Sequence, residues 1–351
     1  MSSLATLLFG RPGTPRANNP AAGEIIGLLV VLAAVVLLFS SLTGRFLSGD
    51  TFTSVAFQLP ELGLLTLAML MPLVSGGFNL AITFSANISG LVLAWILQAN
   101  GGVDAGGMAF ALGISAALLT GAVIGGVMGI VIAYTGAHPI LVSLSMMIFL
   151  RGLGEFLTRG GDISGFPTFV VQLGQGTTLG VPNPLLIFVG CVLVWAVLLK
   201  RTRLGFATYM IGSNAEATRY SGVDTHKSVV LIYTLSGVMC AIAGIVMLTR
   251  FNSVRVGHGE SYLLITVLAS FLGRVDPFGG FGRVIPVVIS LVILQVLASG
   301  LNLLGTNQHL STALWGGILI AVMIMRYAWA KFPIGPFFRR RKSDANLGRK
   351  Q

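Results

Sequence analysis

The chain has 351 residues, of which 54% are hydrophobic and 9% are charged, whereas a typical soluble domain carries about 25% charged residues. Its mean hydropathy is +0.89, which excludes a water-soluble globule. The formal net charge of +11 comes mostly from Lys and Arg at the two ends and in residues 200–227, as expected when cations stay on the cytoplasmic side of a membrane. The basicity therefore indicates topology and not a nucleic-acid partner.

Apolar runs of about 20 residues, long enough to cross a hydrocarbon core about 30 Å thick, recur along the chain. The predicted spans are residues 24–43, 56–75, 78–98, 107–133, 139–158, 183–200, 228–249, 261–273, 284–304 and 310–329. We therefore expect an all-α polytopic membrane protein with about ten transmembrane helices and both termini in the cytoplasm.

Three parts of the chain are expected. Residues 1–23 form a cytoplasmic tail, residues 24–330 a transmembrane domain with a cytoplasmic loop at 200–227, and residues 331–351 a basic cytoplasmic tail. Residues 159–182, rich in Gly, Thr and Pro, are predicted to be an ordered outer loop or a short surface helix.

Two apolar runs are interrupted by Gly and Pro, at residues 72–80 (PLVSGGFNL) and 273–283 (GRVDPFGGFGR). Such breaks are tolerated in a membrane only where the freed backbone groups face protein or a water-lined cavity, and in transporters they often lie on the substrate pathway. Elsewhere, Gly121, Gly125 and Gly129 repeat every four residues, which predicts close packing of two helices.

Residues 200–227 contain a predicted two-turn surface helix. Gly212, Ser213 and Asn214 suit a turn or a helix N-cap, the helix itself covers Ala215 to Tyr220, and Gly222 can end it. A helix this short is marginal in water and needs a surface to dock on. That surface is either a protein partner or the lipid head groups.

The same loop resembles a family signature. Its matching residues are Thr202, Arg203, Gly205, Tyr209, Ile211, Gly212, Asn214, Ala217, Ser221 and Gly222. They follow the pattern TRxGxxxYxIGxNxxAxxxSG of the membrane permeases of ribose-type sugar ABC importers, and the resemblance extends over nearly the whole chain. It implies a type II-like ABC importer permease fold in the bacterial inner membrane.

In that family the segment is a coupling helix that docks on a separate ATPase. The resemblance therefore implies ATPase-coupling roles for Gly212, Asn214, Glu216, Ala217, Arg219, Ser221 and Gly222. It also implies a periplasmic substrate-binding protein and a second permease copy or paralogue as partners. The sequence has no GxxxxGK[ST] phosphate loop, so we expect no cofactor in this chain and ATP hydrolysis by the partner.

Residues 75–90 resemble the GGIDLSVG stretch that lines the route through such permeases, with Asn79 in place of Asp. The substrate-pathway residues implied are Gly76, Gly77, Phe78, Asn79 and Asn87. Asn79 and Asn87 could instead link helices by hydrogen bonds. Residues 276–284 (DPFGGFGRV) resemble the turn after the eighth span and are expected near a cytoplasmic exit gate.

Ionisable residues near the membrane midplane would indicate an ion-coupled carrier. Arg151 and Glu155 lie four residues apart on one helical face, which favours an ion pair over a proton relay. Glu61 follows Pro60 and is expected near the outer end of its span. The two cysteines lie in apolar runs and the four histidines are scattered, so neither a metal site nor catalytic residues are predicted.

The sequence therefore predicts the non-enzymatic permease subunit of an ABC importer for a monosaccharide or small polyol. The alternatives are an ABC permease for nucleosides or branched-chain amino acids, an ion-coupled secondary carrier and, last, a membrane-embedded enzyme.

Overall fold

A computed structural model describes residues 20–306 and 308–331, which fall into two units that divide after Asn307. In the described residues, eight helices are long and apolar enough to cross a membrane. They are α2 (Pro20–Leu42), α3 (Gly49–Val74), α4 (Ile82–Ala99), α5 (Gly107–Thr135), α6 (Pro139–Thr158), α8 (Asn183–Arg201), α11 (Thr225–Phe251) and α13 (Val284–Leu303). The expected all-α polytopic membrane fold is confirmed.

Shorter elements connect these spans. They are the 3-10 turn η1 (Gly102–Asp104) and the helices α7 (Thr168–Gln175), α9 (Arg203–Ser213), α10 (Ala215–Tyr220) and α12 (Tyr262–Leu272). The strands are β1 (Ile163–Ser164), β2 (Thr177–Thr178), β3 (Val181–Pro182) and β4 (Ser253–Val254). The second unit contains α14 (Gln308–Lys331), in agreement with the last predicted span. The two predicted tails lie almost wholly outside the described residues.

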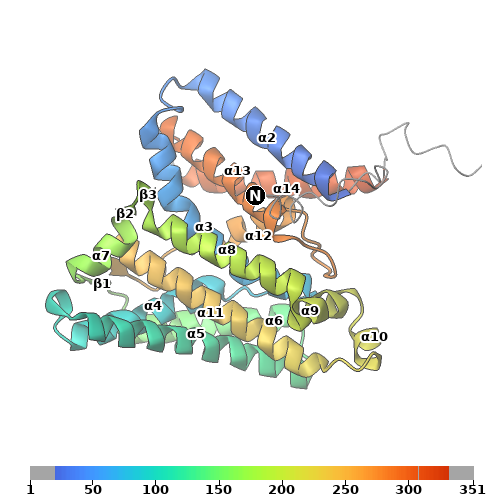
Figure 1. The fold of residues 1–351 in the computed structure, drawn as a ribbon, viewed down its shortest axis with the longest axis horizontal. Coiled ribbons are helices and arrows are strands. Elements are labelled where there is room, and N and C mark those ends of the chain that lie inside the picture. The colour runs from blue at the N-terminus through green and yellow to red at the C-terminus, as the bar shows by residue number, and fades with distance from the viewer. Residues whose placement is uncertain (1–19, 307, 332–351) are drawn as a thin grey trace, which may run out of the picture. The chain divides into compact units, whose positions relative to one another are not determined.

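Apart from α12, the short helices and strands lie at the two ends of the first unit, as Figure 1 shows. Helices α9 and α10 lie at one end, which we call the α9–α10 end. Helix α7 and the four strands lie at the other, which we call the hairpin end. There β1 pairs antiparallel with β4 and β2 with β3, so residues 159–182 form the expected ordered loop, with two strand pairs that were not predicted.

The core of this unit is built on α3 and α11. Every residue of α3 from Leu59 to Val74 is buried, and α11 packs against α3, α4 and α5. The contact of α5 with α11 relies on glycine, because a Cβ on Gly125 would overlap the carbonyl oxygen of Tyr233. A Cβ on Gly121 would meet Gly237 in the same way. The predicted packing role of the glycine stripe is confirmed.

Two predicted spans differ from the structure. The second begins seven residues earlier than expected, because Ser48 caps α3 with its hydroxyl oxygen accepting the Thr51 N–H. The eighth is α12, whose 11 residues span about 16 Å, too little to cross a bilayer. Its packing is set by α13, since the Ser290 hydroxyl donates to the carbonyl oxygen of Ala269 at 2.6 Å.

The expected position of Glu61 near a helix end is wrong. It lies twelve residues into α3, about 18 Å from the first residue of that helix, and its side chain is fully buried. There it forms an ion pair with Arg250 of α11 and accepts a hydrogen bond from the Tyr262 hydroxyl at 3.3 Å. Because the carboxylate is paired inside the protein, it links α3, α11 and α12 and does not face lipid.

Gly125→Ala should lower the free energy of unfolding by about 1–3 kcal/mol, because the added methyl group must displace backbone and not a flexible side chain. Thermal unfolding in detergent measures the change. Gly190→Ala in α8 is the matched control, since a Cβ there meets nothing within 4 Å. Equal melting temperatures of the two variants would show that α5 and α11 do not depend on this close approach.

Candidate functional site

Two helices, and not one, make up the loop between α8 and α11. The predicted helix is confirmed as α10, with the Asn214 side-chain oxygen accepting the Ala217 N–H at 2.9 Å. Gly222, whose φ is +83°, follows it. The sequence analysis missed α9, which begins where the Thr202 hydroxyl oxygen accepts the Gly205 N–H. The cap residue and the apolar spacing of the following residues could have revealed it.

Helix α10 projects from the fold with most of its surface free. Glu216, Ala217 and Arg219 are exposed, and Tyr220 is 87% exposed. Only Thr218 is buried, and its hydroxyl donates to the carbonyl oxygen of Asn214. This chain therefore gives α10 a single anchoring face and leaves the rest of its surface available to a partner.

The loop meets both breaks singled out in the sequence at one point, which we call the glycine junction (Gly76, Gly212, Gly279 and Gly280). A Cβ on Gly212 would overlap the carbonyl oxygen of Val74 and the backbone nitrogen of Gly280. A Cβ on Gly279 would come within 2.6 Å of the Gly76 nitrogen. The Gly280 N–H donates to the carbonyl oxygen of Val74 at 2.8 Å. Three chain segments thus touch backbone to backbone.

Positive φ angles contribute to this arrangement. Gly76, Gly279 and Gly280 have φ of +83°, +90° and +79°, a region that L-residues with side chains rarely adopt. The junction therefore needs glycine for conformation as well as for space. Gly76, predicted on the substrate pathway, and Gly212, predicted in the ATPase-coupling segment, belong to the same contact.

Side chains hold the loop at both of its ends. The hydroxyl of the half-buried Tyr209 donates to the carbonyl oxygen of Gly282 at 2.6 Å, and partial burial raises the pKa of Tyr209. Asp224 caps α11 by accepting the Lys227 N–H at 3.0 Å and pairs with the Lys227 ammonium group. These hydrogen bonds lower the pKa of Asp224. The loop is therefore tied by side chains to the 273–283 turn and to the start of α11.

Asn79 lies fully buried between α3 and α11. Its amide nitrogen donates to the Ser236 hydroxyl oxygen at 2.9 Å, and its amide oxygen accepts the Ala81 N–H at 3.0 Å. Ser236 donates its only hydroxyl proton to the carbonyl oxygen of Ala68. Residue 79 must therefore be a donor toward Ser236, which explains an amide where the related pattern has a carboxylate.

The other expected pathway residues occupy different surroundings. Phe78 is half-buried, and its ring packs edge-to-face with that of Phe271, with the ring centroids 6.4 Å apart. Gly77 is buried where a Cβ would crowd the Tyr233 hydroxyl. Asn87 donates from its amide nitrogen to the carbonyl oxygens of Val256 at 2.5 Å and His258 at 2.9 Å. Asn79 and Asn87 thus contact different elements and form no common cluster.

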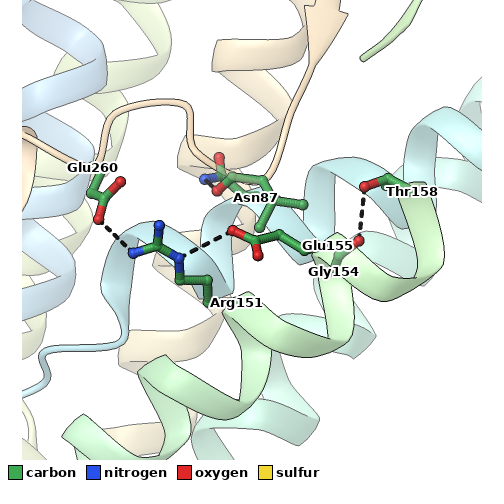
Figure 2. Close-up of polar contacts among 7 residues, drawn as sticks. Asn87, Arg151, Gly154, Glu155, Thr158 and Glu260 are labelled. Atoms are coloured by element: carbon green, nitrogen blue, oxygen red, sulfur yellow. Dashed lines mark hydrogen bonds and ion pairs between the residues drawn. The ribbon is translucent and has the colours of Figure 1, made fainter. Parts of the chain in front are cut away.

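The predicted ion pair in α6 is confirmed, with Arg151 Nε 3.1 Å from Glu155 Oε1. Glu260, from the loop before α12, joins it at 2.9 Å from Arg151 Nη1, as Figure 2 shows. No pattern in the sequence pointed to Glu260 as a third member, because it lies more than 100 residues from Arg151. Across the described residues, no group of three or more His, Cys, Asp or Glu side chains could hold a metal ion.

Asn79→Asp should lower the free energy of unfolding by about 1–3 kcal/mol, because an ionised carboxylate places a second acceptor against Ser236. The deficit should shrink as the pH falls, since a protonated acid can donate again. Melting temperatures at pH 5 and pH 8 measure this. Asn302→Asp at the exposed end of α13 is the control, and equal behaviour of the two variants at both pH values would contradict the explanation.

Comparison with known proteins places this architecture in a family. A family profile described as "Branched-chain amino acid transport system / permease component" matches residues 51–323. The autoinducer 2 import system permease protein LsrD of Yersinia enterocolitica is 30% identical over 310 residues, covering 87% of this chain and 92% of the relative. LsrD of Yersinia pseudotuberculosis, strain YPIII, is 28% identical over 310 residues and covers 87% and 91%.

No solved structure matches the chain. The family profile covers most of the sequence, and the relatives align over nearly their whole length. The chain belongs to this permease family: it is the multi-pass, membrane-spanning subunit of a bacterial ABC importer.

Proposed function

We propose that this permease carries a monosaccharide or a small sugar-like polyol across the bacterial inner membrane. ATP hydrolysis by partner subunits that bind α10 would drive the transport. The observation that supports this proposal most strongly is the glycine junction, which joins the segment before the exposed helix α10 to the breaks at 72–80 and 273–283. A partner that moves α10 can shift both breaks through backbone contacts, without a compressible side chain between them.

The cargo class is supported by the relatives. The similar proteins from Yersinia are named as permeases for the import of autoinducer 2, and the resemblance of the loop is to permeases for ribose-type sugars. The family description names branched-chain amino acid transport, which makes a branched-chain amino acid the second candidate. The ligand retained by the cognate substrate-binding protein decides between them.

The α9–α10 end is proposed to face the cytoplasm, because Lys and Arg concentrate there. The described cations at this end are Lys200, Arg201, Arg203, Arg219, Lys227, Arg274 and Arg283. In the remaining steps of the proposal, a periplasmic binding protein delivers cargo at the hairpin end and a second permease copy or paralogue completes the route. The chain itself needs no cofactor, since the partner hydrolyses ATP.

The first prediction concerns binding of the ATPase. Glu216→Lys should weaken association with the ATPase at least about tenfold, because it reverses an exposed charge on α10 at the proposed interface. Co-purification in mild detergent and cargo-stimulated ATP hydrolysis in proteoliposomes measure the effect. Asp104→Lys, an exposed acid in η1 at the hairpin end, is the control. Normal association of Glu216→Lys would remove α10 from the interface.

The second prediction separates transmission from binding. Gly212→Ala should leave ATPase association intact but reduce cargo-stimulated ATP hydrolysis and uptake about tenfold, since the methyl group forces α9 away from Val74 and Gly280. Ser213→Ala, the exposed neighbour, should behave as wild type. Full stimulation in Gly212→Ala would show that the glycine junction does not transmit the motion of α10.

A further inference from the structure

A charged cavity lies on the α6 side of the fold, toward the hairpin end. Its volume is about 530 Å³, within the usual range of small-molecule sites. The lining residues are Arg151, Glu155, Thr158, Gly160, Arg255, Val256, Gly257, His258 and Glu260. They come from the second half of α6 and from the loop between α11 and α12.

The depth of this cavity argues against a surface ion-pair cluster. Arg151 lies twelve residues into α6, about 18 Å from the start of a helix about 30 Å long. Its side chain is 51% exposed, and that of Glu155 is 52% exposed. Charged side chains at such a depth face a water-filled cavity or another protein, because exposure to hydrocarbon is costly. The exposed side of Arg151 therefore faces either water or another subunit.

The guanidinium group is held in place on three sides. Glu155 and Glu260 bind its Nε and Nη1 atoms, and the group lies 5.8 Å from the ring centroid of Phe84. Among the described residues, its Nη2 atom and the second oxygens of the two carboxylates make no recorded hydrogen bond. A fixed donor thus stands between two acceptors, an arrangement that suits adjacent hydroxyl groups.

The cavity wall is also built to keep its shape. Asn87 is 2% exposed and holds the wall by donating to the carbonyl oxygens of Val256 and His258. Gly154 lets the wall approach α6, since a Cβ there would lie 2.9 Å from Val256 Cγ2. Figure 2 shows Asn87 and Gly154 beside the Arg151 cluster. Asn87 is therefore a positioning residue behind the cavity.

The charges that face the cavity balance. Arg151 and Arg255 oppose Glu155 and Glu260, and Arg255 also lies 3.7 Å from Asp162. Burial lowers the pKa of His258, which favours its neutral form. A site with both donors and acceptors and with balanced charge favours a neutral polar solute over an anion or a cation.

We propose that this cavity is a transient station for the cargo, in which Arg151 donates to, and Glu155 and Glu260 accept from, vicinal hydroxyl groups of a neutral sugar. The inference rests on the proposed function and names the residues that select its cargo class. Contact with few groups keeps binding weak, so the solute is released onward.

The test pairs a residue change with removal of a cargo hydroxyl. Uptake of D-ribose and of 2-deoxy-D-ribose is measured in proteoliposomes holding the complete importer with wild type, Arg151→Lys or Glu260→Gln. Lys keeps the charge of Arg151 but loses its planar pair of donors. Either residue substitution should slow uptake of D-ribose about tenfold, and wild type should take up 2-deoxy-D-ribose about tenfold more slowly than D-ribose. A substituted importer should take up 2-deoxy-D-ribose no more slowly than that, because the substitution and the missing hydroxyl remove the same contact.

The outcomes separate the two levels of the proposal. Two outcomes, given that wild type takes up D-ribose, would show that the cavity does not contact the cargo. In the first, the losses from the residue substitution and from the missing hydroxyl multiply to about a hundredfold. In the second, the variants take up D-ribose at the wild-type rate. If wild-type importer moves L-leucine but neither sugar, the proposed function itself fails. Arg45→Lys makes the same change in an exposed residue that lines a different cavity, and its uptake should equal that of wild type.

Labelling decides whether water or another subunit fills the cavity. Gly257 lines it, and a side chain there meets nothing within 4 Å. Gly257→Cys should react with a membrane-impermeant maleimide applied to the periplasmic face, above the background of the two native cysteines. Gly190→Cys in the apolar α8 should not react. Protection of Gly257→Cys in the assembled importer would show a subunit interface there and overturn the proposal.

Discussion

Direct contact between backbones is the constraint on which this permease depends. At the glycine junction, Gly76, Gly212 and Gly279 bring the loop between α8 and α11 into backbone contact with the two interrupted segments at 72–80 and 273–283. Such contacts have no side chains that could rotate to absorb a displacement, and packed interiors transmit strain. The same principle joins α5 to α11, where carbonyl oxygens of α11 occupy the space that side chains on Gly121 and Gly125 would need. The glycine junction therefore adjoins a helical frame that is itself closely packed.

Polar groups inside this frame fall into two kinds. Asn79 and Glu61 are completely buried and have partners on other helices, so they fix how the helices meet. Arg151 and Glu155 are paired but half-exposed on a membrane-spanning helix. Hydrogen-bonding capacity that the protein leaves open at such a depth is costly in lipid and useful only to water, a neighbouring subunit or a passing solute. The exposure of a polar side chain, and not its residue type, therefore separates residues that hold the helices together from residues proposed to take part in transport.

The loop and the cavity lie toward opposite ends of the first unit, and their surfaces suit different kinds of ligand. Helix α10 presents an exposed, charged surface with one anchoring face, as suits reversible docking of a protein. The cavity presents fixed donors and acceptors with balanced charge, as suits a small neutral solute. Helix α11 runs between the two ends, beginning at Asp224 beside the loop and ending near Arg250, which pairs with Glu61. It packs against α3, α4, α5 and α9.

The sequence by itself determined the features that depend on neighbours in the chain. Hydrophobic runs gave the spans, Asn214 and Gly222 marked the ends of α10, and the spacing of Arg151 and Glu155 gave their ion pair. Each is governed by helix geometry and capping over a few residues. The expected coupling and pathway roles rest on the resemblance of the loop and of residues 75–90 to a known family. That resemblance does not predict which residues contact one another.

Only the tertiary structure decided which distant residues meet. It brought Gly76, Gly212 and Gly279 together, paired Glu61 with Arg250, and added Glu260 to Arg151. It also set α12 at 11 residues, too short for the predicted span. The physical reason is that helices in a bilayer are apolar on faces that meet lipid as well as on faces that meet protein. Hydrophobic periodicity therefore does not distinguish the two, and close packing and buried polar partners select the contacts.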